Sequence, residues 1–396
     1  MDTLLESLKV EILHRLPLQS LALCKCISKH WLTLITSMPR VFTARHHNEL
    51  PLTLLFQYPD KKLGKKIYVI KEKFKYSEFN TSTIRESIDV VASCKDLLLC
   101  LGRVSNNYYI VNCITMQWLK LLPVREVPGK LHVGLVCDSS YNNHDRMESW
   151  FRVVRLILDL HNNIIVEIFS SDTGEWCELQ TSSRPEQQPF SLESATMDIS
   201  GHKRLLLRST GGVVAFGRMI FWQSSKWSIF GFDPNNCVCY FINLGTGFDE
   251  MVDCMGMRNG CLRICMVLRF FDHLELTVLE LKDYKEGGMW CSEHMVEFQD
   301  MDSSNTWLRE IVKKKDLLDY GLRALAHDIK DGDVVYLEIK QQLIMGNMKK
   351  KRLKLIHDIA DDCFYKLGSI YTFVLQWCPN PIPSLPQNIT MKKRKV

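Results

Sequence analysis

The sequence predicts a mainly β protein with a small α-helical domain at its N-terminal end. Leucine-rich segments with helical spacing occupy residues 4–42. From residue 52 onward, short runs of Val, Ile, Leu and aromatic residues alternate with Gly, Asn, Asp and Ser. Helical periodicity is rare after residue 42. These observations together place a small helical domain before a large β domain.

Three short helices are expected in the first forty residues. Five apolar residues three or four positions apart form one stripe of the first helix: Leu4, Leu8, Ile12, Leu13 and Leu16. Pro17 ends this helix and suits the first turn of the next one. Ser28 is placed to N-cap a third helix, which carries Trp31. Helices this short cannot bury all their apolar surface, so part of it is expected to contact a partner.

Strands are expected wherever an apolar run is bounded by turn residues. They are predicted at 52–58, 66–76, 96–102, 108–113, 151–158, 164–170, 219–223, 227–233, 237–244, 275–281, 333–339 and 371–377. A helix is predicted near residues 303–312. A series of strands with so few helices indicates that one all-β domain uses most of the chain.

A loose repeat runs through the strands: strand, turn, strand, polar turn, and an aromatic residue that opens the next strand. Five copies align, at 108–122, 166–179, 228–244, 277–298 and 338–356. The aromatic residue is Trp118, Trp176, Tyr240 and Trp290 in the first four copies. Units of about four strands, longer than the ~40–50 residues of WD or kelch blades, indicate a β-propeller-like domain with long loops. We expect the aromatic residues to be buried packing residues between neighbouring sheets.

Composition excludes several classes of protein. The 396 residues support about two to three domains. Hydrophobic content of 46% and charged content of 24% are ordinary for a globular protein, and a net charge of +5 is too small to indicate nucleic acid or an anionic membrane as partner. No apolar run reaches the ~20 residues of a membrane-spanning helix, and no signal-peptide pattern is present. A cytosolic or nuclear protein is expected.

The cysteines and the catalytic motifs indicate neither a metal site nor an enzyme. The fifteen cysteines have no regular spacing, and Cys237 and Cys239 form a C-x-C pair rather than a zinc-ribbon C-x-x-C. We expect these two cysteines to be buried on one face of a strand. Phosphate-loop, zinc-protease, nucleophile-elbow and dinucleotide motifs are absent. No catalytic residue, metal or cofactor is therefore predicted, although a propeller enzyme remains an alternative.

The N-terminal motif E-I-L-x-R-L-P-x-x-S-L, followed by C-I-S-K-x-W, resembles an F-box. F-boxes usually open with Leu-Pro, where this chain has Leu4 and Leu5. The resemblance implies that residues 1–44 are a three-helix F-box that docks on the Skp-type adaptor of a cullin–RING ubiquitin ligase. The adaptor-binding residues that it implies are Leu4, Leu8, Ile12, Leu13, Leu16, Pro17, Leu21, Cys26, Ile27, Ser28, Lys29 and Trp31.

Later motifs are similar to the F-box-associated domain of plant F-box proteins. They are V-x-I-F-S-S-x-T-G-E-W, G-C-L-R-I-C at 260–265, and ELKDYKEGGMW at 280–290. This likeness implies that residues 45–380 form a propeller-like, kelch-like substrate-recognition domain. The chain would then be the non-catalytic receptor of an SCF-type (Skp–cullin–F-box) E3 ligase. It would link an unknown protein substrate, through the adaptor, to cullin and RING subunits for ubiquitination and degradation.

Residues 381–396 are expected to be a disordered basic tail, because prolines precede a short basic run. That run resembles a nuclear localisation signal and consists of Lys392, Lys393, Arg394 and Lys395. A location in nucleus and cytoplasm is expected, with a solubilising tail as the alternative. For the whole chain, the alternative function is a propeller protein-interaction module without ligase docking.

Overall fold

A computed structural model describes residues 5–16, 18–37, 52–60, 64–71, 75–78, 84, 86–113, 115, 117–124, 130–141, 147–158, 164–180, 213–216, 218–225, 228–244, 252–282, 289–313, 321–340, 342–357, 370–374, 382–383 and 385. All structural statements below concern these residues. Of the expected features, residues 392–395 of the basic tail lie outside them.

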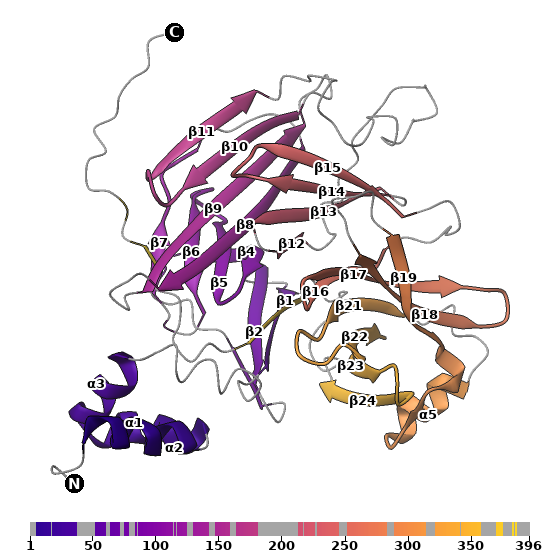
Figure 1. The fold of residues 1–396 in the computed structure, drawn as a ribbon. Helices are drawn as coiled ribbons and strands as arrows, with labels where there is room; N and C mark the ends of the chain where they lie inside the picture. Colours follow the sequence, from indigo (N-terminus) through magenta and orange to yellow (C-terminus); the bar gives the residue numbers. More distant parts are fainter. Residues whose placement is uncertain are drawn as a thin grey trace.

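Three helices occupy the N-terminal region, as predicted. They are α1 (Glu6–Arg15), α2 (Leu18–Ile27) and α3 (Lys29–Ser37), and they form a cluster of their own in Figure 1. Their small core consists of Leu13, Leu21, Leu34 and Ile35. Ser28 caps α3 as predicted, because its Oγ accepts the backbone N–H of His30 at 3.2 Å.

Six β-sheets make up most of the rest of the described chain (Figure 1). The first contains β1 (Leu52–Asp60), β2 (Gly64–Lys71), β3 (Lys75–Glu78) and β25 (Ile370–Val374), in the order β25-β1-β2-β3. The second contains β4 (Ile88–Cys94), β5 (Leu97–Gly102), β6 (Tyr108–Asn112) and β7 (Trp118–Lys120). The third contains β8 (Lys130–Tyr141), β9 (Met147–Leu158), β10 (Ile164–Ser170) and β11 (Glu175–Gln180).

The remaining sheets follow the same plan of strands adjacent in sequence. The fourth contains β12 (Val213–Phe216), β13 (Met219–Ser225), β14 (Ser228–Asp233) and β15 (Val238–Asn243). The fifth contains β16 (Cys254–Arg258), β17 (Cys261–Arg269), β18 (Leu274–Lys282) and β19 (Met289–Glu297). The sixth contains β21 (Arg323–His327), β22 (Val334–Ile339), β23 (Gln342–Asn347), β24 (Arg352–His357) and a short parallel strand, β20 (Asp302–Ser303). Between β19 and β21 lie a 3₁₀ turn, η6 (Phe298–Asp300), and the helix α5 (Thr306–Lys313).

The sheets follow one another in a propeller-like arrangement. The first strands of successive sheets lie side by side in the order β4, β8, β12, β16 and β21, and β25 lies next to β21. Strand β25 also pairs with β1, with Leu54 opposite Thr372. The last described strand therefore completes the first sheet, which joins the two ends of the β domain. The prediction of a mainly β, propeller-like protein is confirmed.

Apolar side chains from neighbouring sheets form the cores between them. Leu99 and Ile110 of the second sheet pack in one cluster with Phe151 and Phe169 of the third. The later interfaces repeat this arrangement, with Val154 near Phe230, Phe221 near Ile264, and Val267 near Val335. The second to sixth sheets are therefore stabilised mainly by burial against their neighbours.

The repeat aligns residues that are structurally equivalent. Its aromatic residues lie in the fourth strands of four consecutive sheets, β7, β11, β15 and β19. Each stands opposite a residue of the third strand, in the pairs Trp118–Val111, Trp176–Phe169, Tyr240–Gly231 and Trp290–Leu281. The expectation that all are buried is wrong: Trp118 is 42% exposed, and Trp176 and Trp290 are only half-buried. The fourth strand is the edge of its sheet, so only one neighbouring strand of that sheet lies beside its side chains.

Contacts with the β domain continue further toward the C-terminus than expected. Ile382 and Leu385 fall within the range predicted as a disordered tail, yet both contact the core between the second and third sheets. These two contacts extend the folded β domain beyond residue 380, to at least Leu385.

The described residues also bear on membrane-spanning helices and on the C-x-C pair. No helix among them is long and apolar enough to cross a membrane. Cys237 is exposed, because it lies in the turn before β15 with a φ of 56°, while Cys239 is half-buried on the strand. The prediction that both are buried on one strand face is therefore wrong, since only one of them belongs to the strand.

Candidate functional site

The three N-terminal helices present several large apolar side chains to solvent. The set, which we call the helical apolar surface, consists of Leu5, Leu8, Ile12, Leu23, Ile27 and Leu32. The core of the module leaves them uncovered, and among the side chains that the structure describes it consists of four buried apolar residues. Exposed apolar residues concentrated in so short a segment are typical of a contact surface for another protein.

The predicted adaptor-binding residues divide between this surface and the core. Leu8, Ile12 and Ile27 are exposed on the helical apolar surface. Leu13 and Leu21 are buried in the core, at 1% and 0% exposure, so they hold the helices together. Leu16 and Trp31 are half-buried against that core, Ser28 caps α3, and Lys29 is exposed. Leu4, Pro17 and the side chain of Cys26 lie outside the described residues.

Sequence reasoning missed three members of the helical apolar surface: Leu5, Leu23 and Leu32. The spacing of Leu5, Leu8 and Ile12 is i, i+3, i+7, which places them on one helix face. That signal was present, but the stripe predicted from Leu4 to Leu16 has almost the same period and also includes the buried Leu13. Only the packing of α2 and α3 against α1 separates the two stripes.

A second exposed apolar surface lies in the β domain, at the tip of the hairpin formed by β17 and β18. Phe271 is fully exposed there and Phe270 is partly exposed. The turn is ordered by a hydrogen bond from the backbone N–H of Phe270 to the carbonyl of His273, at 3.0 Å. The rings of Phe270 and His273 stack with centroids 4.6 Å apart. Together with the exposed Met295 of β19, these residues form what we call the hairpin surface.

The hairpin surface carries negative charge. The carboxylate of Asp272 accepts a hydrogen bond from Nδ1 of His273 at 2.7 Å. This hydrogen bond raises the pKa of His273 above its ordinary value, and the carboxylates of Glu297 and Glu275 act in the same direction. Glu275 and Glu297 stand directly opposite each other on β18 and β19, a placement that is unfavourable for like charges. Three carboxylates therefore act on His273 beside the exposed aromatic tip.

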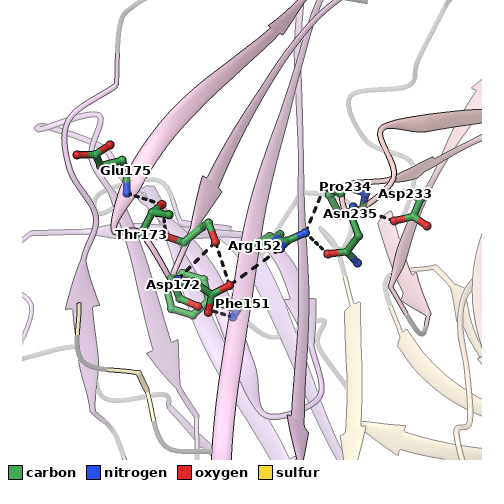
Figure 2. Close-up of polar contacts among 10 residues, drawn as sticks. Phe151, Arg152, Asp172, Thr173, Glu175, Asp233, Pro234 and Asn235 are labelled. Atoms are coloured by element: carbon green, nitrogen blue, oxygen red, sulfur yellow. Dashed lines mark hydrogen bonds and ion pairs between the residues drawn. The ribbon is translucent and has the colours of Figure 1, made fainter. Parts of the chain in front are cut away.

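A polar cluster joins the third and fourth sheets (Figure 2). Arg152 of β9 donates to the carbonyl oxygen of Pro234 at 3.2 Å and to the side-chain oxygen of Asn235. Asp233 orders the same turn, because its Oδ1 accepts the backbone N–H of Asn235 at 2.8 Å. The carboxylate of Asp172 lies 4.0 Å from the guanidinium on the other side. These contacts fix one sheet against the next, and they are structural.

A second polar cluster braces the loop between β5 and β6. The carboxylate of Glu86 accepts hydrogen bonds from the hydroxyl groups of Ser105 and Tyr109, each at 2.5 Å, and from the backbone N–H groups of Val104 and Ser105. Burial raises the pKa of Glu86, but these hydrogen bonds outweigh it and lower the pKa to about 2. Val104, at the tip of the loop, is therefore held exposed on a rigid support.

The described residues contain no cluster of three or more His, Cys, Asp or Glu side chains that could hold a metal ion. The described residues do form two exposed apolar surfaces suited to binding other proteins. One lies on the N-terminal helices and the other at the tip of the β17–β18 hairpin.

Comparison with known proteins identifies a distant relative. No protein-family model matches the chain. An F-box protein of Arabidopsis thaliana is 22% identical over 264 residues, which cover 60% of this chain and 54% of the relative. The chain thus matches about half the length of that relative. The similarity points to F-box proteins in general.

Solved structures resemble the β domain only loosely. A chain of the nidogen/laminin complex matches 83% of this chain and 100% of its own length, with a TM-score of 0.42 and 10% identity. YCF48 from Cyanidioschyzon merolae covers 81% of this chain and 95% of its own, with a TM-score of 0.40 and 11% identity. An oligogalacturonate lyase in complex with manganese covers 79% and 76%, with a TM-score of 0.39 and 11% identity. Similarities at this level carry no argument about function.

Proposed function

We propose that this chain is the substrate receptor of an SCF-type ubiquitin ligase. In this proposal the helical apolar surface docks on a Skp-type adaptor, and the β domain holds the protein to be ubiquitinated. The observation that carries it is the concentration of exposed Leu and Ile side chains on three short helices. The distant similarity to an F-box protein of Arabidopsis thaliana supports the same assignment.

The energetics of the helical apolar surface favour a partner. Fully burying one Leu or Ile side chain contributes about 1.5–3 kcal/mol, so several buried together can exceed the cost of association. Truncating two central anchors should then weaken binding by tenfold or more, since each 1.4 kcal/mol is a factor of ten. Core residues such as Leu13 would affect binding only indirectly, through the fold of the module.

Capture of the full chain by an immobilised Skp-type adaptor tests the proposal. The double variant Leu8→Ala/Ile12→Ala removes two exposed anchors of α1 and should reduce capture at least tenfold. Val104→Ala is the matched control, because Val104 is an exposed apolar residue on the β5–β6 loop. It should leave capture unchanged. Circular dichroism and the thermal midpoint of each variant check that both retain the fold.

The outcomes separate the proposal from its alternatives. Loss of capture in the double variant, with cullin co-purifying with the wild type, supports a ligase receptor. A wild-type chain that the adaptor does not capture contradicts the proposal and favours a protein-interaction module without ligase docking. Equal capture of the wild type and the double variant would show that α1 is not the docking helix.

We propose that the hairpin surface contacts the substrate. Its exposed Phe271 and Met295, with the carboxylates of Asp272, Glu275 and Glu297 near His273 of the same turn, complement a segment that carries both apolar and basic side chains. Affinity purification with the proteasome inhibited tests this. Phe271→Ala should lose a set of proteins that Met289→Ala retains, because Met289 is an exposed apolar residue at the opposite end of β19. Identical sets for both variants would contradict the assignment.

A further inference from the structure

Two cysteines meet where the second and third sheets pack together. Cys94 ends β4 and Cys137 lies on β8, 43 residues away in sequence. The backbone N–H of Cys137 donates to Sγ of Cys94 at 3.2 Å, and Sγ of Cys137 donates to the carbonyl oxygen of Cys94 at 3.2 Å. The two thiol groups also share a hydrogen bond. Each sulfur atom therefore contacts the main chain of the other cysteine, which holds the two side chains next to each other.

The surroundings distinguish the two thiols. Cys94 is half-buried, whereas Cys137 is only 3% exposed. Next to them, the ammonium group of Lys95 forms an ion pair with Asp138 at 2.6 Å, and both of these side chains reach solvent. The hydrogen bond from Cys137 lowers the pKa of Cys94, and the charge of Lys95 acts in the same direction, while burial and the carboxylate of Asp138 oppose them. The pKa of Cys137 is raised by its hydrogen bond to Cys94 and by burial.

We propose that Cys94 and Cys137 form a reversible, peroxide-sensitive disulfide that links the second and third sheets. Cys94 is the reacting thiol, because it is the more exposed of the two and lies beside a cation. Cys137 is the resolving thiol, held in contact with it. The proposal is independent of the ligase function, since it concerns only the β domain.

The chemistry balances with a hydroperoxide as the oxidant. The thiolate of Cys94 attacks one oxygen of hydrogen peroxide, so that an S–O bond forms, the O–O bond breaks and hydroxide leaves as water. Cys94 is then a sulfenic acid. The sulfur of Cys137 attacks the sulfur of Cys94, the S–S bond forms, and a second hydroxide leaves with the proton of Cys137. Two thiols and one peroxide thus give one disulfide and two waters.

A second pair of cysteines provides an internal control. Cys254 and Cys265 stand opposite each other on β16 and β17, and their thiol groups are also hydrogen-bonded. Both are fully buried, and burial raises the pKa of Cys254. The two pairs share the contact between thiols and differ in exposure and in the neighbouring cation. Peroxide should therefore oxidise the Cys94–Cys137 pair first, if exposure and charge control the reaction.

The test treats the full chain with increasing hydrogen peroxide, blocks free thiols with iodoacetamide, and maps tryptic peptides by mass spectrometry. Trypsin releases Cys94 in residues 86–95 and Cys137 in residues 131–146. A linked pair of these peptides should appear at lower peroxide than any link to residues 264–269, which carry Cys265. Dithiothreitol should reverse it. If Cys94 and Cys137 are still free, and therefore alkylated, at peroxide concentrations that already link Cys254 and Cys265, the proposal is overturned.

Single variants test the order of the steps. In Cys137→Ser the resolving thiol is gone, so Cys94 should accumulate as a sulfenic acid that dimedone labels. In Cys94→Ser, Cys137 should stay unlabelled. The reverse pattern, or equal labelling of both, would contradict the assigned roles. Cys254→Ser serves as a control that removes a buried thiol from another sheet, and the thermal midpoint of each variant confirms that it remains folded.

Discussion

The indole Nε1–H of Trp176 donates a hydrogen bond to the main-chain carbonyl of Leu122 at 3.1 Å. This contact joins the outer strand of the third sheet to the segment that follows the second. The ring of Trp176 also packs against Tyr108 of the second sheet and Phe169 of its own. Trp118, the equivalent residue of the preceding sheet, contacts only the ring of Tyr109 of its own sheet among the aromatic residues described. Equivalent positions in the repeat thus have different roles.

This difference predicts unequal effects on stability. Trp176→Ala should lower the free energy of unfolding by about 3 kcal/mol, because it removes a packed ring and leaves a carbonyl without its donor. Trp118→Ala should lower it by less, about 1 kcal/mol, since Trp118 is 42% exposed and makes no hydrogen bond across the sheets like that of Trp176 among the contacts described. Urea denaturation followed by circular dichroism measures both. Equal losses would contradict the division of roles between the two residues.

Arg152 should control the turn between β14 and β15. Arg152→Ala removes the hydrogen bonds to Pro234 and Asn235 (Figure 2), at a cost of about 1–3 kcal/mol for contacts of a charged group. The amides of residues 235–237 should then exchange faster with deuterium. Arg352→Ala is the control, because its ion pair with Asp302 is exposed and contributes less than about 1 kcal/mol. No change in exchange at the turn would show that Asp233 alone orders it.

The lowered pKa of Glu86 predicts that the stability of the β5–β6 loop depends on pH only in the acidic range. Its pKa is about 2 in the folded protein, against an ordinary value of 4.5, so its contribution to stability is present above pH 4.5 and is lost as pH falls through about 2. The carboxylate is partly exposed, so solvent screens the effect. The protection of the Val104 and Ser105 amides from hydrogen exchange, relative to unstructured amides at the same pH, should fall over this range and stay constant between pH 5 and 8.

Two variants check that the Glu86 carboxylate is the cause. Glu86→Gln should raise the exchange of the Val104 and Ser105 amides at neutral pH, because a neutral amide accepts weaker hydrogen bonds. Gly102→Ala should act similarly, since a Cβ at Gly102 would lie 2.5 Å from Oε2 of Glu86 and displace the carboxylate. An exchange rate at the loop that neither variant alters would contradict this account.

His273 should titrate above the ordinary histidine value of 6.5, because Asp272 stabilises its protonated form. A raised pKa in the folded state stabilises the turn at low pH, and this contribution is lost as pH rises through the folded pKa. NMR titration of the ring protons measures the shift. Asp272→Asn should return the pKa toward 6.5, with Glu293→Gln as a control carboxylate that does not perturb His273. A pKa that stays raised in Asp272→Asn would assign the effect to Glu275 and Glu297 instead.

Sequence patterns located the strands that are buried on both faces. Strands β5, β6 and β22 have almost every residue buried, so each appears in the sequence as a continuous apolar run. Sequence patterns revealed none of the first strands of the second to sixth sheets, which are β4, β8, β12, β16 and β21. β4 alternates buried and half-buried residues and contains Asp89 and Ser93, and β12 is short and only half-buried. Such segments become strands because neighbouring sheets pair with them.

The sequence by itself determined that three short helices come first, the cap at Ser28, the apolar middle strands and the equivalence of the repeated aromatic positions. These are local properties, because each depends on residues within a few positions of one another. Only the tertiary structure decided that β25 pairs with β1, that Leu8 is exposed while Leu13 is buried, and that Trp176 packs between sheets while Trp118 does not. Each of these depends on contacts between segments far apart in the chain, where two apolar stripes or two aromatic residues of the same local pattern meet different neighbours.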